Sequence, residues 1–378
     1  MVKVSVIVPL YKGKKYILDM IQQIEACSNK MSCEVELIFV NDYPEDVLES
    51  YGSNLINVVV LNTDINRGIH GARVEGLKHA SGEFVWFLDQ DDRVNDDFLK
   101  EQISALMNSD ADAVVCGAVR EGKSVYDSAV SLVQAVDLNF MLENGNFIVS
   151  PGQVLIRKDR IPYAWRDHIL KINGVDDWFL WLCMLNEGCE FEVDDKDLYE
   201  HIDDGGNASS NTYRMFQSEN EMLDIIIENH LFDDSNIERL SYCISKMQRN
   251  QICLLDKFRR MFFVYDDWMR LNSEGKNITS YLQKTEVKKI GIYGLGYIGK
   301  QLAAEIANSN IELVYCVDKN ASFISSQYEI LPDIDTTKEV ELYVVTVLDG
   351  AEDICDLIRS NTGVCAKSFT LLLEEVRG

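Results

Sequence analysis

A short apolar run that ends in three carboxylates constrains this chain more than any other feature of its sequence. Residues 84–88 read Phe-Val-Trp-Phe-Leu, and Asp89, Asp91 and Asp92 follow directly. Such a run predicts a buried strand of a parallel sheet, which delivers the carboxylates to the C-terminal sheet edge where open α/β sheets bind ligands. Carboxylate oxygens grouped this closely suit a hard divalent cation such as Mg²⁺ or Mn²⁺. The alternative is a charged turn after a strand.

Strand-like and helix-like patterns alternate around this run. Strands are expected near residues 3–9, 35–41, 57–62, 84–88 and 112–117, with helices between the first four, and the pattern is mixed from there to about residue 205. This alternation predicts βαβ units and therefore an α/β fold with a mainly parallel sheet.

Five short segments carry a resemblance to a known family. In chain order they are Val-Ser-Val-Ile-Val-Pro-Leu-Tyr at 4–11, an apolar run ending in Asn-Asp at 36–42, Asn-Arg-Gly to Gly-Ala-Arg at 66–73, Ala-Ser-Gly-Glu at 80–83, and Asp-Gln-Asp-Asp at 89–92. In this order and spacing, residues 1–101 resemble the nucleotide-binding half of a family 2 glycosyltransferase. The resemblance implies a GT-A-type nucleotide-diphospho-sugar transferase domain.

The resemblance also implies roles for the strand-end residues. Pro9 and Tyr11 lie at the tip of the first strand, where an aromatic ring can pack against a base. Asp42 follows the second strand, where an exposed carboxylate accepts the ring N–H of a uracil. Arg73 pairs with the base or a phosphate, since a guanidinium fork suits such groups. The alternatives are a half-buried strand end for Tyr11 and a solvated helix face for Arg73.

The same resemblance assigns the metal-binding residues. Asp91 is the first metal ligand, and Asp89 supports it or contacts the ribose. His201 follows in the acidic segment 199–204 and completes the metal shell or contacts the diphosphate, since neutral imidazole is a common ligand. A surface histidine in an acidic loop is the alternative for His201. His168 is a minor candidate for the acceptor site.

A second pair of acids stands at the start of a predicted helix. Apolar residues recur at helical spacing from Val175 to Leu185, and Asp176 and Asp177 open this pattern. The positive end of a helix favours the ionised carboxylate that a general base requires. The pair resembles the family's Glu-Asp-Trp helix start, which implies that Asp177 is the base and that Asp176 binds substrate. Simple helix capping is the alternative.

Composition excludes several classes of function. The formal net charge is −26 over 378 residues, which argues against a nucleic-acid partner, since that partner requires clustered cations. Ten cysteines are scattered without a Cys-x-x-Cys pair, as in a reducing cytoplasm. Neither a membrane-spanning run nor a signal-peptide pattern stands in the sequence, so we expect a cytoplasmic protein, with the inner face of the membrane as an alternative location.

Residues 211–285 change in character and predict a helical linker of two or three helices between domains at 1–210 and 286–378. This linker contains the most basic local stretch, in which Lys246, Arg249, Lys257, Arg259 and Arg260 alternate with aromatic residues. The stretch suits peripheral contact with an anionic membrane surface, or it is a packed helix with one solvated face.

The last ninety residues restart an α/β pattern. Gly294, Gly296 and Gly299 follow a strand and open a helix, and Asp318 ends the next strand, which predicts a small Rossmann-like domain and a candidate cofactor site. So short a segment makes only half of a dinucleotide-binding domain. NAD is therefore not the expected cofactor, and a packing or oligomerisation module, including a homo-oligomer contact, is the favoured use.

Together these features predict a metal-dependent, inverting glycosyltransferase that uses Mn²⁺ or Mg²⁺. It would transfer sugar from a nucleotide sugar, UDP-linked by preference, to a hydroxyl of a polysaccharide or glycolipid. Two alternatives from other classes remain: an NAD-linked sugar oxidoreductase acting through the C-terminal domain, and a non-catalytic scaffold that binds nucleotide sugars.

Overall fold

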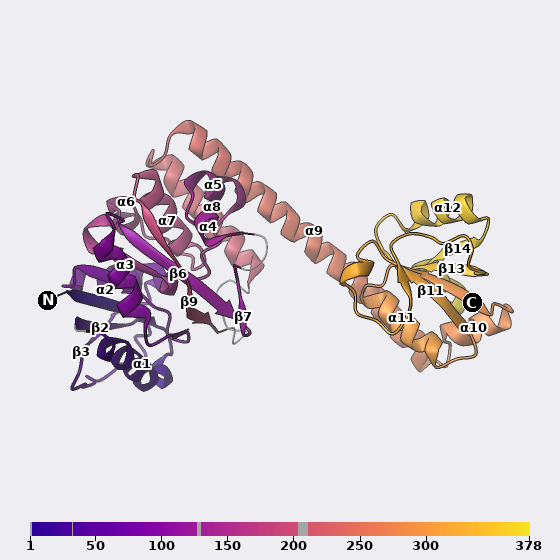
Figure 1. Ribbon diagram of the computed structural model, residues 1–378, viewed down its shortest axis with the longest axis horizontal. Coiled ribbons are helices and arrows are strands. Elements are labelled where there is room, and N and C mark those ends of the chain that lie inside the picture. Colours follow the sequence, from indigo (N-terminus) through magenta and orange to yellow (C-terminus); the bar gives the residue numbers. More distant parts are fainter. Residues whose placement is uncertain (1, 32, 127–129, 203–210) are drawn as a thin grey trace. The chain divides into compact units, whose positions relative to one another are not determined.

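The computed structural model describes residues 2–31, 33–126, 130–202 and 211–378. They form two compact units, Met1–Arg249 and Asn250–Gly378, which are considered separately below (Figure 1). The segment 211–285, predicted as a linker, contributes helices to both units. Among the described residues, no helix has both the length and the apolar character needed to cross a membrane.

The first unit is built on a nine-stranded sheet of order β3-β2-β1-β4-β8-β6-β9-β5, with β7 paired to β6. The strands predicted from the sequence are all present, and β1, β2, β3, β4, β6 and β9 run in one direction. The helix expected between the second and third strands is not formed, and residues 42–56 are a loop. The strand bounds are β1 Lys3–Leu10, β2 Glu34–Asn41, β3 Asn57–Asn62, β4 Phe84–Phe87, β5 Arg93–Val94, β6 Ala113–Arg120, β7 Lys123–Ser124, β8 Val154–Arg157 and β9 Phe191–His201.

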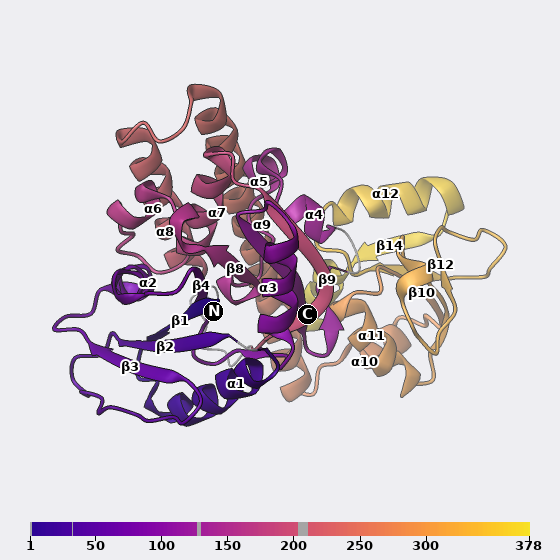
Figure 2. The ribbon, with the colours of Figure 1, turned by 60° about the vertical axis from the view of Figure 1, so that its left-hand side comes forward.

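Helices cover both faces of this sheet because alternate strand residues point to opposite sides. Val6, Val8 and Trp86 pack with helices α1 and α3, whereas Ile7 and Phe87 pack with α2 and α7 (Figure 2). The helix bounds are α1 Ile17–Asn29, α2 Gly68–His79, α3 Phe98–Asn108, α4 Leu132–Ala135, α5 Leu138–Asn144, α6 Tyr163–Asp167, α7 Asp176–Asn186, α8 Thr212–Glu228 and α9 Asp234–Ser273.

The strand register brings three strand ends to one edge of the sheet. Leu10 at the end of β1 pairs with Asn41 at the end of β2, and Ile7 of β1 pairs with Phe87 at the end of β4. The segments that follow these strands therefore start side by side, at the carboxyl edge where ligands bind in such sheets.

Helix α9 belongs to both units. Its first part packs on the core of the first unit through Leu240 and Ile244, and its last part packs on the second unit through Trp268 and Leu271. Every residue from 251 to 260 is exposed, whereas Met247 packs on the core of the first unit and Met261 packs on the core of the second, so the basic stretch is packed only at its ends.

The second unit contains a five-stranded sheet of order β12-β11-β10-β13-β14, in which every pair is parallel. One face packs against α11, α13, α10 and the end of α9, and the other packs against α12. The bounds are β10 Lys289–Tyr293, β11 Glu312–Val317, β12 Ile330–Leu331, β13 Leu342–Val345 and β14 Cys365–Ser368, with α10 Ile278–Lys284, α11 Tyr297–Ala307, α12 Ala351–Thr362 and α13 Phe369–Arg377.

Candidate functional site

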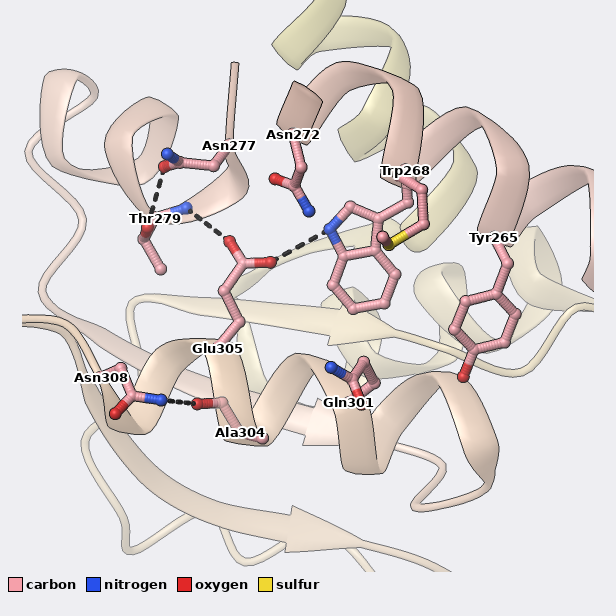
Figure 3. A pocket seen from close by; sticks show the side chains of 10 residues that line it. Tyr265, Trp268, Asn272, Asn277, Thr279, Gln301, Ala304, Glu305 and Asn308 are labelled. Atoms are coloured by element: carbon pink, nitrogen blue, oxygen red, sulfur yellow. Dashed lines mark hydrogen bonds between the residues drawn. The ribbon is translucent and has the colours of Figure 1, made fainter. Parts of the chain in front are cut away.

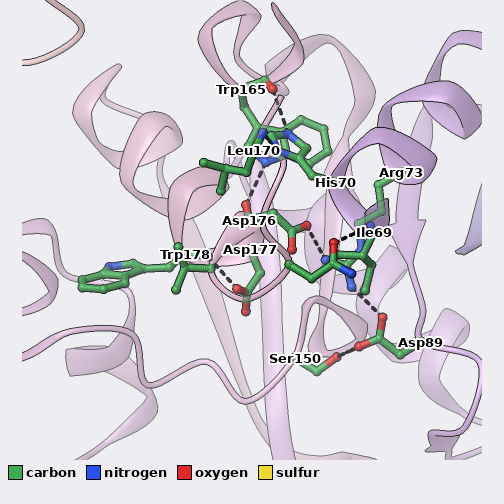
Figure 4. A network of polar contacts seen from close by, with 12 residues as sticks. Ile69, His70, Arg73, Asp89, Ser150, Trp165, Leu170, Asp176, Asp177 and Trp178 are labelled. Atoms are coloured by element: carbon green, nitrogen blue, oxygen red, sulfur yellow. Dashed lines mark hydrogen bonds and ion pairs between the residues drawn. The ribbon is translucent and has the colours of Figure 1, made fainter. Parts of the chain in front are cut away.

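Arg73 joins two of the predicted site carboxylates at the carboxyl edge of the first sheet (Figure 4). It lies on α2, is 3% exposed, and places one guanidinium nitrogen 2.5 Å from Asp89 Oδ1 and the other 2.5 Å from Asp176 Oδ2. The solvated-helix alternative for Arg73 is therefore wrong. Its Nε is also buried and makes no hydrogen bond to the part of the chain that the structure describes. The Nε–H group of this charged side chain is therefore a hydrogen-bond donor that the described residues leave unused.

The charges in this group stabilise one another. Burial alone would lower the pKa of Arg73, but Asp176 and Asp89 raise the pKa above its ordinary value, so the guanidinium stays charged. Burial raises the pKa of Asp89, and Arg73 opposes that shift. Ser150 donates to the second oxygen of Asp89 at 3.1 Å, which fixes the orientation of this carboxylate.

Asp177 stands beside this group in the first turn of α7, as the sequence predicts. Its Oδ2 accepts a hydrogen bond from Asn146 Nδ2 at 3.1 Å, and its Oδ1 accepts one from the backbone N–H of Trp178 at 2.8 Å. Burial, and then the neighbouring charge of Asp176, raise the pKa of Asp177 to about 7. A carboxylate with this pKa exchanges protons near neutral pH, which is the property that a general base needs.

Asp42 occupies the predicted place at the end of β2, but it is not the exposed carboxylate that we expected. It is 4% exposed, and its Oδ1 accepts hydrogen bonds from the backbone N–H of Arg67 at 2.7 Å and from Thr63 Oγ1 at 3.3 Å. Burial raises its pKa. Asp42 therefore organises the loop before α2, a long-range contact that the strand pattern alone does not reveal.

Tyr11 is an exposed aromatic residue at the tip of β1, after the buried Pro9. Its ring packs edge-on against Tyr43 with centroids 5.4 Å apart, and Lys12 Nζ lies 5.1 Å from the Tyr43 ring centroid. Gln90, between the predicted acids, accepts a hydrogen bond from the Tyr11 backbone at 3.2 Å. Tyr11 is 50% exposed, so the half-buried alternative stays open, and the turn 89–92 lies against the aromatic tip.

Asp92 and His201 form the other side of this turn. Asp92 is 4% exposed and accepts hydrogen bonds from the Tyr199 hydroxyl and from the backbone N–H of Ile202. His201 Nδ1 lies 3.2 Å from Asp92 Oδ1, and this contact raises the pKa of His201. His201 therefore lies beside the acidic turn 89–92 rather than on an open surface loop. Asp91 is half-buried at the same turn.

The carboxylates at this turn suit a cation that is coordinated mainly by water and by the phosphates of a bound substrate. Within the described ranges, no cluster of three or more His, Cys, Asp or Glu side chains has the geometry of a metal cage. Mg²⁺ commonly takes one or two carboxylates, several waters and substrate phosphates instead of an all-protein cage. Asp91, with Asp89 next to it, supplies oxygen ligands of that kind. Asp203 and Asp204 lie outside the described residues.

His70 is a site residue that the sequence did not single out. It is 1% exposed on α2, where its Nδ1 accepts from the Leu170 backbone and its Nε2 donates to the Trp165 carbonyl, both at 3.0 Å. Burial lowers the pKa of His70 to about 4, so the ring is neutral. Trp165 Nε1 in turn donates to the Asp176 carbonyl at 2.8 Å. His70 thus holds the segment before α7 against α2, whereas the His168 side chain makes none of these contacts.

The glycine-rich turn of the second unit is present but largely self-contained. Gly294 has a φ of +94°, and a Cβ on Gly299 would lie 2.0 Å from the Gly294 carbonyl, so α11 packs closely on its strand. A Cβ on Gly296 would meet open space. Asp318 accepts backbone N–H groups of Leu295 and Asn320 at 2.7 and 2.9 Å. Its carboxylate therefore stabilises the turn itself.

The first unit is thus an α/β domain in which carboxylates, an arginine and an aromatic tip meet at the carboxyl edge of a mainly parallel sheet. Residues 5–161 match the family model Glycosyl transferase family 2, which is less than half of the chain. The predicted α/β class, with a mainly parallel sheet, helices and a second small parallel sheet at the C-terminal end, is confirmed. The match also supports a glycosyltransferase.

Curated relatives match about a third of the chain. The chain is 30% identical over 125 residues to putative glycosyltransferases of Mycobacterium tuberculosis, covering 32% of this chain and 36% of that relative. It is 34% identical over 120 residues to the poly(ribitol-phosphate) beta-N-acetylglucosaminyltransferase TarS of Staphylococcus aureus, covering 30% of this chain and 21% of that relative. The chain therefore spans about a third or less of the length of these relatives.

Solved structures align with the chain at lower identity. S. aureus TarS 1–349 in complex with UDP aligns with a TM-score of 0.45 and 18% identity, over 64% of this chain and 70% of that chain. A mannosyltransferase from Pyrobaculum calidifontis in complex with GDP-Man and Mn²⁺ aligns with a TM-score of 0.45 and 16% identity, over 65% of this chain and 68% of that chain.

Proposed function

We propose that this protein is an inverting glycosyltransferase that moves a sugar from a UDP-sugar to a hydroxyl of a polysaccharide or glycolipid acceptor. The observation that carries the proposal is the contact between Arg73, Asp89 and Asp176, with Asp177 as its neighbour in α7. This contact links the strand-end acids of the nucleotide-binding half to the helix that carries the proposed base. The match of residues 5–161 to family 2 supports the same class of reaction.

Different residues of the chain have separate roles in an inverting transfer. Asp177 accepts the proton of the acceptor hydroxyl as that oxygen attacks the anomeric carbon, and Asp176 and Arg73 hold the first turn of α7 in place. Tyr11 packs on the base, and Asp42 orders the loop beside it. Asp91 and Asp89, with His201 beside them, would hold a divalent cation, which would supply charge neutralisation for the departing diphosphate.

Ligand-induced stabilisation tests donor binding without knowledge of the acceptor, because a ligand that binds only the folded state raises the unfolding midpoint. We would compare UDP, GDP, dTDP, CMP, NAD and a set of UDP-sugars, each with and without Mn²⁺. We expect stabilisation by UDP and by one UDP-sugar that depends on Mn²⁺. Stabilisation by NAD alone, indifferent to metal, would instead favour the oxidoreductase.

Two matched substitutions separate binding from chemistry. Asp91→Asn is expected to lose the Mn²⁺-dependent part of the UDP stabilisation, whereas Asp177→Asn is expected to keep it and to lose turnover of the UDP-sugar. Glu187→Gln, at the exposed end of α7, is the control for both. Wild-type turnover by Asp177→Asn would refute the base assignment, and donor binding without any turnover by the wild type would favour the scaffold.

We further propose that α9 contacts the anionic inner face of a membrane. Ile252, Leu255, Phe258 and Phe262 are each about half exposed or more, at a spacing that puts them on one side of the helix. The same region carries the five cations noted in the sequence against a single acid, Asp256, in a chain of net charge −26. An amphipathic helix with basic and aromatic residues binds anionic lipid through both contributions.

Vesicle co-sedimentation tests this contact. We expect binding to phosphatidylglycerol vesicles and not to phosphatidylcholine vesicles, and its loss in Phe258→Ser/Phe262→Ser. The exposed Phe323→Ser is the control. A second copy of the chain would be shown to cover this helix instead if the protein bound neither kind of vesicle and if the double substitution dissociated an oligomer.

A further inference from the structure

The second unit contains a hollow that the proposed transferase does not use. Its volume is about 490 Å³, and it lies between the end of α9, the start of α10 and one side of α11 (Figure 3). Its walls include Tyr265, Trp268, Asn272, Asn277, Gln301 and Glu305. Residues from three separate helices converge here, so the hollow is formed by the packing of the unit and not by one loop.

Side-chain amides dominate the polar part of this wall. Asn272 and Gln301 make no side-chain hydrogen bond to the described part of the chain, and both are exposed. Asn277 uses its Oδ1 to accept from Ser280 and Thr279, which leaves its amide N–H₂ group available. Each amide group can both donate and accept. The hollow therefore presents donors and acceptors together, which matches a ligand rich in hydroxyl groups.

The charge of the wall excludes an anionic ligand. No lysine, arginine or histidine lines the hollow, whereas Glu305 contributes a carboxylate. Glu305 accepts hydrogen bonds from Trp268 Nε1 at 3.0 Å and from the Thr279 backbone N–H at 3.3 Å. A phosphate, a nucleotide or a uronate would face this carboxylate without a compensating cation. A neutral ligand meets no such penalty.

Two aromatic rings form the apolar part of the same wall. Tyr265 and Trp268 lie nearly parallel, with an interplanar angle of 21° and centroids 6.0 Å apart, and Tyr265 is partly accessible. The Glu305 hydrogen bond and the contact with Phe369 hold Trp268 in place. The C–H face of a sugar ring packs favourably on an aromatic ring, because the ring face carries partial negative charge.

We propose that this hollow is a binding site for a neutral saccharide chain, separate from the donor site of the first unit. The partly accessible Tyr265 ring, backed by the buried Trp268, would support a pyranose face, and Asn272, Asn277 and Gln301 would bind its hydroxyl groups. The inference concerns binding only and does not depend on the proposed transferase activity.

Saturation-transfer NMR on the full chain tests the site without any nucleotide present. The probes are cellotetraose, maltotetraose and chitotetraose at millimolar concentration. We expect saturable binding of at least one of them, weakened about tenfold or more in Asn272→Ala/Gln301→Ala, since two hydrogen bonds to the ligand are lost. Both residues are exposed, so the double variant should keep the wild-type unfolding midpoint.

The exposed Gln283→Ala on α10 is the matched control, and it should bind as the wild type does. A second variant, Tyr265→Leu, removes the ring and should weaken binding of the same probe. The proposal is overturned if none of the three tetrasaccharides binds, if the double variant binds as tightly as the wild type, or if UDP competes with the bound saccharide.

Discussion

Arg73 contacts Asp89, 16 positions away along the chain, and Asp176, 103 positions away. The buried guanidinium is the only cation that the structure places in contact with these two carboxylates among the described residues. Removal of the guanidinium would leave the carboxylates of Asp89 and Asp176 close together without their cationic partner. Removing one partner of a buried ion pair destabilises a protein by more than the pair itself contributes, because the other charge stays buried without a partner.

Arg73→Met is therefore expected to lower the free energy of unfolding by about 3–5 kcal/mol. Urea denaturation at neutral pH measures this loss. Lys78→Met, an exposed position on the same helix, should change stability by less than about 0.5 kcal/mol. Equal stabilities of Arg73→Met and Lys78→Met would show that the contact contributes little to the fold.

The raised pKa of Asp177 predicts a particular pH dependence. Only the ionised carboxylate accepts a proton, so turnover of the UDP-sugar should fall as the pH decreases through about 7, far above the ordinary carboxyl range. The measurement is kcat/KM from pH 5 to 9. An acid limb near pH 4 would mean that Asp177 is solvated like a surface carboxylate, or that another group is the base.

At the scale of elements, α2 and the segment before α7 are held together by His70. Its two ring nitrogens satisfy the Trp165 carbonyl and the Leu170 N–H, and its ring packs on Trp165 with centroids 4.5 Å apart. Trp165 then reaches Asp176. The position of the proposed base thus depends on a neutral histidine whose role is structural.

His70→Phe keeps an aromatic ring but leaves a buried carbonyl and a buried N–H without partners. Each such group costs about 1–3 kcal/mol, so we expect the two to lower stability by about 2–6 kcal/mol together with reduced turnover. Urea denaturation and donor turnover measure the two effects. The control is His79→Phe on the exposed part of the same helix, and a similar result for both variants would contradict the proposed role of His70.

The local pattern predicted the elements of the first unit well, because strand and helix periodicity is a property of neighbouring residues. It placed Asp42 at the end of β2 and Asp177 at the start of α7 correctly. It did not predict that Asp42 is buried under Arg67 and Thr63, or that His70 is buried at all. Both facts depend on which segments fold over these side chains.

At the scale of the whole molecule, the two units have separate hydrophobic cores. The residues of the first unit pack in two clusters on the faces of the nine-stranded sheet, and those of the second unit pack in two others. Since no cluster mixes the two sheets, we expect the units to unfold as two cooperative transitions.

Calorimetry with Leu302→Ala tests this expectation. Leu302 is fully buried in α11, so its truncation should cost about 2–5 kcal/mol and lower only the transition of the second unit. Leu357→Ala, at an exposed position of α12, should lower neither. UDP with Mn²⁺ should raise only the other transition. A single transition that shifts as a whole would show that the units are coupled.

The sequence by itself determined the α/β class, the strand ends that carry acids, the helix that begins at Asp176, and the resemblance to family 2. These depend on periodicity and on short motifs, which are local. Only the tertiary structure decided the burial of Arg73 between two carboxylates, the role of His70, the exposure of residues 251–260 and the hollow between α9, α10 and α11 in the second unit. The physical reason is that burial and charge compensation are set by which distant faces pack together, and local spacing does not contain that information.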